Sequence, residues 1–366
     1  MLLSVLFYIL VATTAIQLIY FLCFSSILFN QKDHKTTTQT PISIIICAKN
    51  EAQNLKQFLP YIINQKYPDF EIVLINDASS DGTLEVMELF QSKHTNIKIV
   101  NVKNNESFWG NKKYALTLGI KAATNPQLLF TDADCKPASK YWIDSMVGNF
   151  SEEKSIVLGY GKYKTKNTLV NLLVRFETLI TAIQYFSYAK LGNPYMGVGR
   201  NLAYKKEEFF RTKGYIKHIQ IRSGDDDLFI QEAATKTNTA ISLDKDSFTI
   251  SKPPTTLKEW FVQKRRHMST STYYKFNHKV LLGLYFISKA IFYLTAIVLV
   301  FLMNWRIITP FILAYLIGLF LVFGISANRF REKKIIFFLP FLEIALLVFQ
   351  FSIFSSNIFS KPTHWK

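Results

Sequence analysis

Residues 130–137 read Phe130-Thr131-Asp132-Ala133-Asp134-Cys135-Lys136-Pro137, and they decide which fold we expect. The run Leu128-Leu129-Phe130 is short and apolar, which predicts a strand buried on both faces. Two carboxylates follow with one residue between them, and side chains alternate along a strand. We therefore expect Asp132 and Asp134 to share a face and to offer oxygens to one Mg²⁺ or Mn²⁺. A solvated turn is the alternative for an isolated pair of this kind.

Segments typical of strands and of helices alternate before this pair. Apolar, β-branched runs predict strands at 42–47, 71–75 and 97–102, and helices are expected at about 50–64, at 84–93 and from Lys112 onward. Asn50 is the expected cap of the first helix. This alternation predicts a doubly wound α/β domain with a parallel sheet, in which ligands lie at the carboxyl ends of the strands. The acidic residues at those ends are Glu51, Asp77, Asp81, Asp132 and Asp134.

The chain has 366 residues and a net charge of +17, and the charge is unevenly distributed. Residues 279–366 hold nine Lys and Arg against two acids, which leaves 34 against 24 for residues 32–278. A basic middle region suits anionic lipid headgroups and phosphorylated substrates. No nucleic-acid recognition motif accompanies the charge, so we expect no nucleic acid partner.

Four long apolar segments predict membrane spans, at 2–29, 280–303, 307–326 and 335–358. We expect an anchor at 1–30, a globular domain at 41–278 and three further membrane helices within 279–359. A cleaved secretory signal is the alternative for the first segment. Lys289 lies near one end of its span and is expected to snorkel to the interface. Glu343 is expected to face the helix bundle or the membrane surface.

Basic residues in a short loop predict the orientation of the spans. The loop 327–334 carries Arg329, Arg331, Lys333 and Lys334, so we expect it in the cytoplasm. Successive crossings then place 304–306 and the C-terminal tail outside and the globular domain in the cytoplasm, in a multi-pass plasma (inner) membrane protein. Cys23, Cys47 and Cys135 do not form a disulfide set, which agrees with a reducing compartment.

Three motifs together resemble the family-2 inverting glycosyltransferases of the GT-A fold: Cys47–Glu51, Asn76–Thr83 and Thr131–Asp134. The resemblance covers about residues 41–270. It implies a nucleotide-diphosphate sugar donor, with a UDP-sugar as the first choice, and a divalent cation. On the family pattern Asp77 holds the nucleotide base, Glu51 lies near that base, and Lys112 lies near the diphosphate. Because Asn111 is inserted after Gly110, Lys113 stays an alternative to Lys112.

The second half of this region supplies the acceptor side of the resemblance. The run Gly197–Asn201 resembles the family's glycine-rich loop and assigns Gly199 and Asn201 to the acceptor; a tight turn is the alternative. The run Ser223–Leu228 holds three consecutive acids, and the resemblance makes Asp226 the catalytic base. A solvated acidic loop is the alternative. Adjacent acids predict at least one raised pKa, and Asp227 is expected to cap a helix beginning near Leu228.

Two further segments bear on the membrane side of the function. Residues 167–191 carry an apolar helical stripe, which either packs in a core or lies against the membrane. The run Gln263-Lys264-Arg265-Arg266-His267 resembles the Gln-x-x-Arg-Trp motif of membrane-embedded synthases. On that pattern Arg266 contacts the donor, and Gln263 and His267 lie toward the acceptor. His267 replaces the tryptophan, which argues against processive synthesis; a basic interfacial segment is the alternative.

These features together predict a cytoplasm-facing glycosyltransferase anchored in the membrane, which transfers a hexosyl or N-acetylhexosaminyl group with inversion. The expected acceptor is a membrane lipid or a lipid-linked or extruded glycan. A processive polysaccharide synthase is the second possibility, although four spans and His267 argue against it. A glycan-binding or assembly subunit without activity is the third, and the complete set of acids argues against that.

Overall fold

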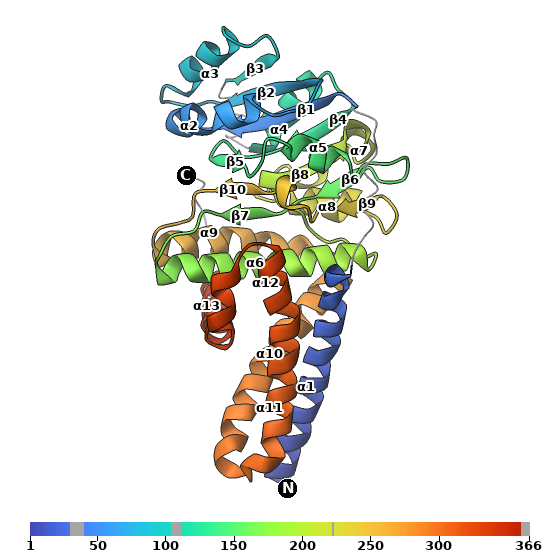
Figure 1. Cartoon of the computed structure of the whole chain (residues 1–366), viewed down its shortest axis with the longest axis vertical. Coiled ribbons are helices and arrows are strands. Elements are labelled where there is room, and N and C mark those ends of the chain that lie inside the picture. The colour runs from blue at the N-terminus through green and yellow to red at the C-terminus, as the bar shows by residue number, and fades with distance from the viewer. Residues whose placement is uncertain (30–39, 104–111, 222, 360–366) are drawn as a thin grey trace. The chain divides into compact units, whose positions relative to one another are not determined.

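The computed structural model of the chain describes residues 1–29, 40–103, 112–221 and 223–359 (Figure 1). The chain divides into two compact units. One unit comprises Gln31–Lys164 and Gly192–Pro254, and the other comprises Met1–Asn30, Thr165–Leu191 and Thr255–Thr363. The predicted globular domain at 41–278 is therefore larger than the compact unit, because two of its helices belong with the apolar helices. The polar linker 31–39, the residues Gly110 and Asn111, and the tail beyond 359 lie outside the described residues.

The larger sheet of the first unit has the strand order β3-β2-β1-β4-β8-β6-β9. Its four parallel strands are the predicted ones: β1 (Ile42–Ala48), β2 (Phe70–Asp77), β3 (Ile97–Val102) and β4 (Gln127–Phe130). Strand β8 (Leu202–Lys205) pairs antiparallel with β4 and with β6 (Ile156–Leu158), and β9 (Thr239–Ile241) is parallel to β6. The α/β class is confirmed, but the sheet is mixed rather than wholly parallel.

Helices cover the parallel half of this sheet: α2 (Ala52–Ile63), α3 (Thr83–Gln91), α4 (Lys112–Ala122) and α5 (Trp142–Val147). Apolar side chains of β1 and β2 form a core with α2 and α5 in which Trp142 is fully buried. Helix α4 packs against β1 and β2. Gly119 permits that approach, because a Cβ atom there would lie 2.1 Å from the Ile75 side chain.

A second sheet, which the sequence did not predict, follows directly from the acidic pair. Strand β5 (Cys135–Pro137) pairs antiparallel with β10 (Thr249–Ser251), which is parallel to β7 (Gly161–Tyr163). Pro137 is the last residue of β5, which lies at the edge of this sheet. An edge position tolerates proline, which has no N–H to donate to a ladder.

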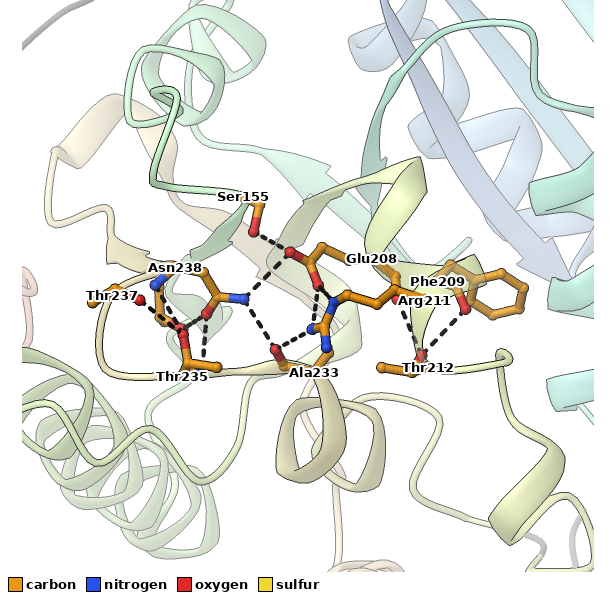
Figure 2. A network of polar contacts seen from close by, with 10 residues as sticks. Ser155, Glu208, Phe209, Arg211, Thr212, Ala233, Thr235, Thr237 and Asn238 are labelled. Atoms are coloured by element: carbon orange, nitrogen blue, oxygen red, sulfur yellow. Dashed lines mark hydrogen bonds and ion pairs between the residues drawn. The ribbon is translucent and has the colours of Figure 1, made fainter.

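A polar network around the buried Glu208 fixes the end of helix α8 (Asp227–Ala233), as Figure 2 shows. Glu208, in α7 (Lys206–Arg211), accepts hydrogen bonds from Ser155 Oγ at 2.5 Å and from Asn238 Nδ2 at 3.3 Å. Arg211 pairs with Glu208 and donates to the carbonyl of Ala233 at 2.9 Å, and Asn238 Nδ2 donates to the same carbonyl at 3.0 Å. The helix that begins with the run of three acids is therefore held at its far end by a charged, satisfied network.

The second unit is helical. It contains α1 (Leu2–Ser25), α6 (Leu169–Lys190), α9 (Leu257–Thr270), α10 (Phe276–Leu302), α11 (Trp305–Leu319), α12 (Ile325–Arg329) and α13 (Leu339–Phe359). Among the described residues, five helical stretches are long and apolar enough to cross a membrane: 2–28, 169–190, 276–302, 305–329 and 333–359. Four of them correspond to the predicted spans. The fifth is α6, whose most apolar window is 67% buried within the protein.

A buried ion pair joins two of the predicted spans. Lys289 Nζ donates to Glu343 Oε1 at 2.7 Å and to the Tyr285 hydroxyl at 2.8 Å, while the hydroxyls of Tyr293 and Tyr315 donate to Glu343 Oε2 at 2.8 and 2.7 Å. Lys289 is 6% exposed and Glu343 is 1% exposed. The expectation that Lys289 snorkels was therefore wrong, whereas Glu343 faces the helix bundle as expected.

Candidate active site

A pocket lies at the carboxyl ends of β1 and β4, where the topology of the sheet predicts a ligand. Its wall combines apolar side chains of the strands with charged groups. The lining residues are Ile45, Cys47, Lys112, Leu116, Phe130, Thr131, Asp132, Gly199, Leu202, Tyr204, Tyr215, Asp225 and Asp226. Predicted site residues from four separate segments of the chain therefore meet at one place.

The acidic pair lies in a turn rather than on a strand. Strand β4 ends at Phe130, so Asp132 and Asp134 do not share a strand face, and that part of the prediction was wrong. The turn nevertheless gathers the pair, because Asp132, Asp134 and Cys135 offer ligand atoms that all lie within 4.8 Å of one another. Burial and the neighbouring Asp132 raise the pKa of Asp134 to about 6. Two half-buried carboxylates with this mutual repulsion fit a hard divalent cation.

The structure distinguishes Lys112 from Lys113. Lys112 Nζ lies 3.2 Å from Asp132 Oδ1 and 3.0 Å from Asp225 Oδ2. Burial alone would lower the pKa of Lys112, but the two carboxylates raise it well above its usual range. Lys113 is 1% exposed and donates instead to the carbonyls of His218 and Ile221, at 2.8 and 3.0 Å. Lys112 therefore belongs to the site, and Lys113 holds the segment that leads to the three acids.

The three consecutive acids occupy three different environments. Asp225 faces Lys112, and despite its burial this partner lowers its pKa. Asp226 accepts the backbone N–H of Gly199 at 2.7 Å through Oδ2 and that of Asp227 at 2.8 Å through Oδ1. Burial, Asp225 and Asp227 raise the pKa of Asp226 to about 7. The expectation of a raised pKa is confirmed for Asp226, which is also the N-cap of α8, a role the sequence had assigned to Asp227.

The glycine-rich loop holds this arrangement together. Gly199 supplies the N–H that binds Asp226. Asn201 is fully buried: its Nδ2 donates to the carbonyls of Tyr160 and Ser247 at 3.0 and 2.7 Å, and its Oδ1 accepts from Trp142 Nε1 at 3.0 Å. Every polar atom of the Asn201 amide is thus bonded inside the fold. Its place favours a positioning role over the contact with an acceptor that the resemblance implied.

The residues assigned to the nucleotide lie at the ends of β1 and β2. Asp77 is 4% exposed, and burial raises its pKa although Lys49 and Lys112 oppose the shift. Glu51 is the N-cap residue of α2 and accepts a hydrogen bond from Asn54 Nδ2. Asn50 is therefore not the cap. It adopts a left-handed backbone with φ 57° and accepts the N–H of Ser80 at 2.8 Å, which joins the two loops.

The remaining predicted residues belong to the helical unit. Gln263, Arg266 and His267 lie on α9, where neighbouring basic residues bind partners of the same unit. Lys264 Nζ lies 2.6 Å from Glu177 Oε2, and Arg265 Nε donates to Asn357 Oδ1 at 2.9 Å. Helix α9 is thereby tied to α6 and α13. The roles of Gln263, Arg266 and His267 toward donor and acceptor stay predictions.

Two charged residues that the sequence did not assign to the site also face it. Asp225 is the partner of Lys112, and its position in the acidic run was a signal that could have identified it. Arg200 binds the carbonyl of Gly161 at 2.7 Å and stacks 4.6 Å from the centre of the Tyr163 ring. Its charge opposes the raised pKa of Asp134. No sequence pattern indicated this role of Arg200, because its contacts with Gly161 and Tyr163 depend on the unpredicted second sheet.

Known proteins with similar sequences belong to one class of enzyme. Residues 43–215 match the family described as "Glycosyl transferase family 2". A Haemophilus influenzae protein described as "Uncharacterized glycosyltransferase" is 31% identical over 146 residues, which is 39% of this chain and 41% of that protein. The poly-beta-1,6-N-acetyl-D-glucosamine synthase of Staphylococcus epidermidis is 27% identical over 157 residues, 42% of this chain and 36% of the synthase.

Similarity of fold extends further along the chain than similarity of sequence. The mannosyltransferase of Pyrobaculum calidifontis, solved in complex with GDP-Man and Mn²⁺, has a TM-score of 0.59 and 17% identity and covers 91% of this chain and 96% of its own. The chain spans less than half the length of the two sequence relatives named above. The family match and the similarity of fold nevertheless point to the same kind of domain. Residues 43–215 therefore match a glycosyltransferase family 2 domain, and the α/β unit has a GT-A-like fold.

Proposed function

We propose that this chain is a membrane-anchored glycosyltransferase that moves a sugar, with inversion, from a nucleotide-diphosphate donor to a membrane-associated acceptor. One observation carries the proposal. Asp226, a carboxylate with a pKa of about 7, lines the same pocket as Lys112 and Asp132. A general base works best when its pKa lies near the operating pH. The pocket thus contains a general base, Asp226, and a positively charged side chain, Lys112, that suits the diphosphate of the donor.

The proposed reaction is a single displacement. The acceptor hydroxyl oxygen attacks the anomeric carbon of the donor from the side opposite the diphosphate. Its proton passes to Asp226, the new glycosidic bond forms, and the bond to the leaving diphosphate oxygen breaks with its electron pair. Gly199 holds the Asp226 carboxylate through its N–H. Lys112, held by Asp225, directs its charge toward the diphosphate, where negative charge grows.

Asp132 and Asp134 are the residues that would hold a divalent cation, as their converging carboxylates suit Mg²⁺ or Mn²⁺. When bound, such a cation offsets the charge of the departing diphosphate. Burial makes the Cys135 thiolate costly and raises its pKa well above the usual range, so two oxygens and no thiolate are the expected protein ligands. The Mn²⁺ in the mannosyltransferase complex supports this assignment for a shared fold.

The donor and the acceptor are proposed by class. Asp77 and Glu51 lie where a nucleotide base would be recognised, and a UDP-sugar carrying a hexosyl or N-acetylhexosaminyl group is our first choice. Relatives described as "4,4'-diaponeurosporenoate glycosyltransferase" and "Poly-beta-1,6-N-acetyl-D-glucosamine synthase" support a lipid or glycan acceptor. The synthase relative also keeps processive synthesis as a second candidate, against which His267 still argues.

The proposed location is the plasma membrane, with the catalytic domain in the cytoplasm. The positive loop around Lys334 supports this orientation. A reporter fused after Lys334 should behave as cytoplasmic, and one fused at Lys366 as external. The opposite pattern in a permeability assay would overturn this orientation and the cytoplasmic donor with it.

Turnover with a panel of nucleotide sugars tests the function. The purified full-length chain should release a nucleoside diphosphate with one sugar, and nuclear magnetic resonance of the product should show an inverted anomeric carbon. Single additions support the transferase, and long products support the processive alternative. If no nucleotide sugar is bound or turned over by the protein while Asp226→Asn behaves identically, the chain is an inactive subunit.

A further inference from the structure

One face of helix α2 carries a row of side chains away from the pocket just described. Asn54, Phe58 and Tyr61 are spaced four and three residues apart, which places them along one side of a helix. Lys252, which follows β10, places its Nζ 5.3 Å from the centre of the Phe58 ring. Lys136, in β5, places its Nζ 5.0 Å from the centre of the Tyr61 ring. Two lysines from two other segments thus lie over two rings of α2.

The row continues past the end of α2 with a third ring. The Nζ atoms of Lys140 and Lys66 lie 5.6 and 5.9 Å from the centre of the Tyr141 ring. Backbone and side-chain bonds fix this arrangement: the N–H of Lys66 donates to the carbonyl of Lys140 at 2.8 Å, and Gln65 Nε2 donates to the carbonyl of Ser139 at 2.9 Å. The lysines and rings therefore form one connected surface.

The same surface contains a groove. Its lining is formed by Pro60, Tyr61, Asn64, Gln65, Lys136, Pro137, Ala138, Ser139 and Lys140. The segments 52–68 and 135–143, which contribute the rings and all but one of the lysines, contain no aspartate or glutamate. The positive charge of the groove is therefore not offset by its own lining. Tyr61 and Tyr141 are 50% and 42% exposed, so part of each side chain is accessible to a ligand beside the lysines.

We propose that this surface, the α2 track, binds an anionic glycan. We define the track by Lys252, Phe58, Lys136, Tyr61, Lys140, Tyr141 and Lys66. Lysines attract phosphate or carboxylate groups as compact point charges. Exposed tyrosine rings offer flat apolar faces to the C–H faces of sugars at a small cost in side-chain entropy. A glycan with acidic substituents presents both partners at once.

The shape and the surroundings of the track favour a glycan. From Asn54 to Ile63 the helix rises by roughly 14 Å at 1.5 Å per residue, which suits an extended chain of sugars. The track also starts beside the candidate site, because Asn54 binds both Glu51 and Lys252.

Binding of a labelled anionic glycan to the full-length chain tests this inference independently of catalysis. The chain is reconstituted in phosphatidylcholine nanodiscs, and the probe is fluorescent dextran sulfate, with neutral dextran for comparison. The triple variant Lys136→Gln, Lys140→Gln, Lys252→Gln should bind dextran sulfate about tenfold or more weakly, because a lysine beside an anionic surface contributes roughly fivefold. The matched triple variant Lys93→Gln, Lys121→Gln, Lys236→Gln should keep the affinity within about twofold.

Two further variants separate the contributions of charge and of the rings. Lys→Arg at the same three track positions retains the charge and should retain binding, which excludes misfolding as the cause of the loss. Tyr61→Ala with Tyr141→Ala keeps the charge and should weaken dextran sulfate binding about fivefold or more, because the flat apolar faces that the sugars contact are lost.

Three results would overturn the proposal. Equal losses in the track and control triples would mean that net charge alone attracts the probe. Unchanged dextran sulfate binding by the tyrosine variant would mean that the lysines attract the sulfate groups and that the rings do not contact the sugars. The track would be a lipid contact if phosphatidylglycerol vesicles captured nanodiscs of the parent but not of the track triple, while the track triple still bound dextran sulfate. Because no turnover is measured, failure here leaves the proposed transferase activity untouched, and the converse also holds.

Discussion

The pKa of Asp226 predicts how the reaction depends on pH. Burial raises this pKa first, and the neighbouring Asp225 and Asp227 raise it further, from 3.8 to about 7. About one tenth of the base is then ionised at pH 6, half at pH 7 and nine tenths at pH 8. We therefore expect kcat/KM to rise about tenfold between pH 6 and pH 8. A base with an ordinary pKa would change by under about 1% over that range.

Substitution of the same residue supplies the second half of this prediction. Asp226→Asn keeps the shape and one acceptor oxygen for the N–H groups of Gly199 and Asp227, but it removes the proton acceptor. Turnover should fall about 10²–10⁴-fold. Asp227→Asn is the matched control. It should keep most of the turnover and move the rise in kcat/KM to lower pH, because one negative charge near Asp226 is lost.

The pKa of Asp226 also predicts in which direction the stability of the protein changes with pH. The folded pKa of Asp226 is higher than the unfolded one, so the folded chain binds the extra proton between about pH 3.8 and about pH 7. Stability is therefore lost as the pH rises through that window and stays reduced above it. Asp226→Asn removes the charge, so its Tm should exceed that of the parent at pH 8 and match it near pH 4.

Initial rates measured from about pH 5.5 to pH 9 across the three proteins, with thermal unfolding at the two ends, check these statements together. A pH profile of kcat/KM that is flat in the parent would refute the assigned pKa. Equal and mild effects of Asp226→Asn and Asp227→Asn would place the base elsewhere. A severe effect confined to Asp227→Asn would mean that the family assignment is displaced by one residue.

Other residues give predictions of different kinds. Lys112→Gln should weaken nucleoside-diphosphate binding, measured by calorimetry, about 10- to 100-fold. Lys113→Gln should instead reduce the free energy of unfolding by about 1–3 kcal/mol, because two carbonyls lose their hydrogen-bond donor. Asp134→Ala should abolish the Mn²⁺ dependence of nucleotide-sugar titrations and leave the Tm within a few degrees; an unchanged titration would make the acids a plain turn. Glu343→Leu should destabilise the detergent-solubilised protein by about 3–5 kcal/mol, and adding Lys289→Met should recover most of that loss; equal Tm values for both would contradict it.

Local patterns along the sequence were enough to predict the parallel half of the sheet. The run Ile42–Cys47 holds four isoleucines in six residues, and a strand buried on both faces suits such a run. The site lay where those strands end, so Asp77, Asp132 and Asp226 could be proposed from the order of the motifs. Asp132 and Asp226 converge in one pocket, whose lining includes the ends of the neighbouring strands β4 and β1, whereas Asp77 ends β2 outside that lining.

What the sequence could not show depends on contacts between distant segments. Strand alternation was extended past Phe130, although the strand ends there and Asp132 begins a turn. Asn201 was assigned to the acceptor from its place in the glycine-rich loop, whereas its amide binds Trp142, Tyr160 and Ser247 inside the fold. The choice between Lys112 and Lys113 could not be made either. Adjacent residues on a helix point in different directions, and nothing local tells which one meets an acid.

The pair formed by Lys289 and Glu343 also constrains how the protein is made. Synthesis runs from the N-terminus, and 54 positions separate the lysine from its partner. At roughly 5–20 residues per second, the ribosome needs about 3–11 s to cover that stretch. During this interval Lys289 lies on α10, a helix long and apolar enough to cross a membrane, without its counter-charge. A nascent chain that stops before Glu343 therefore keeps an apolar helix that carries an uncompensated lysine.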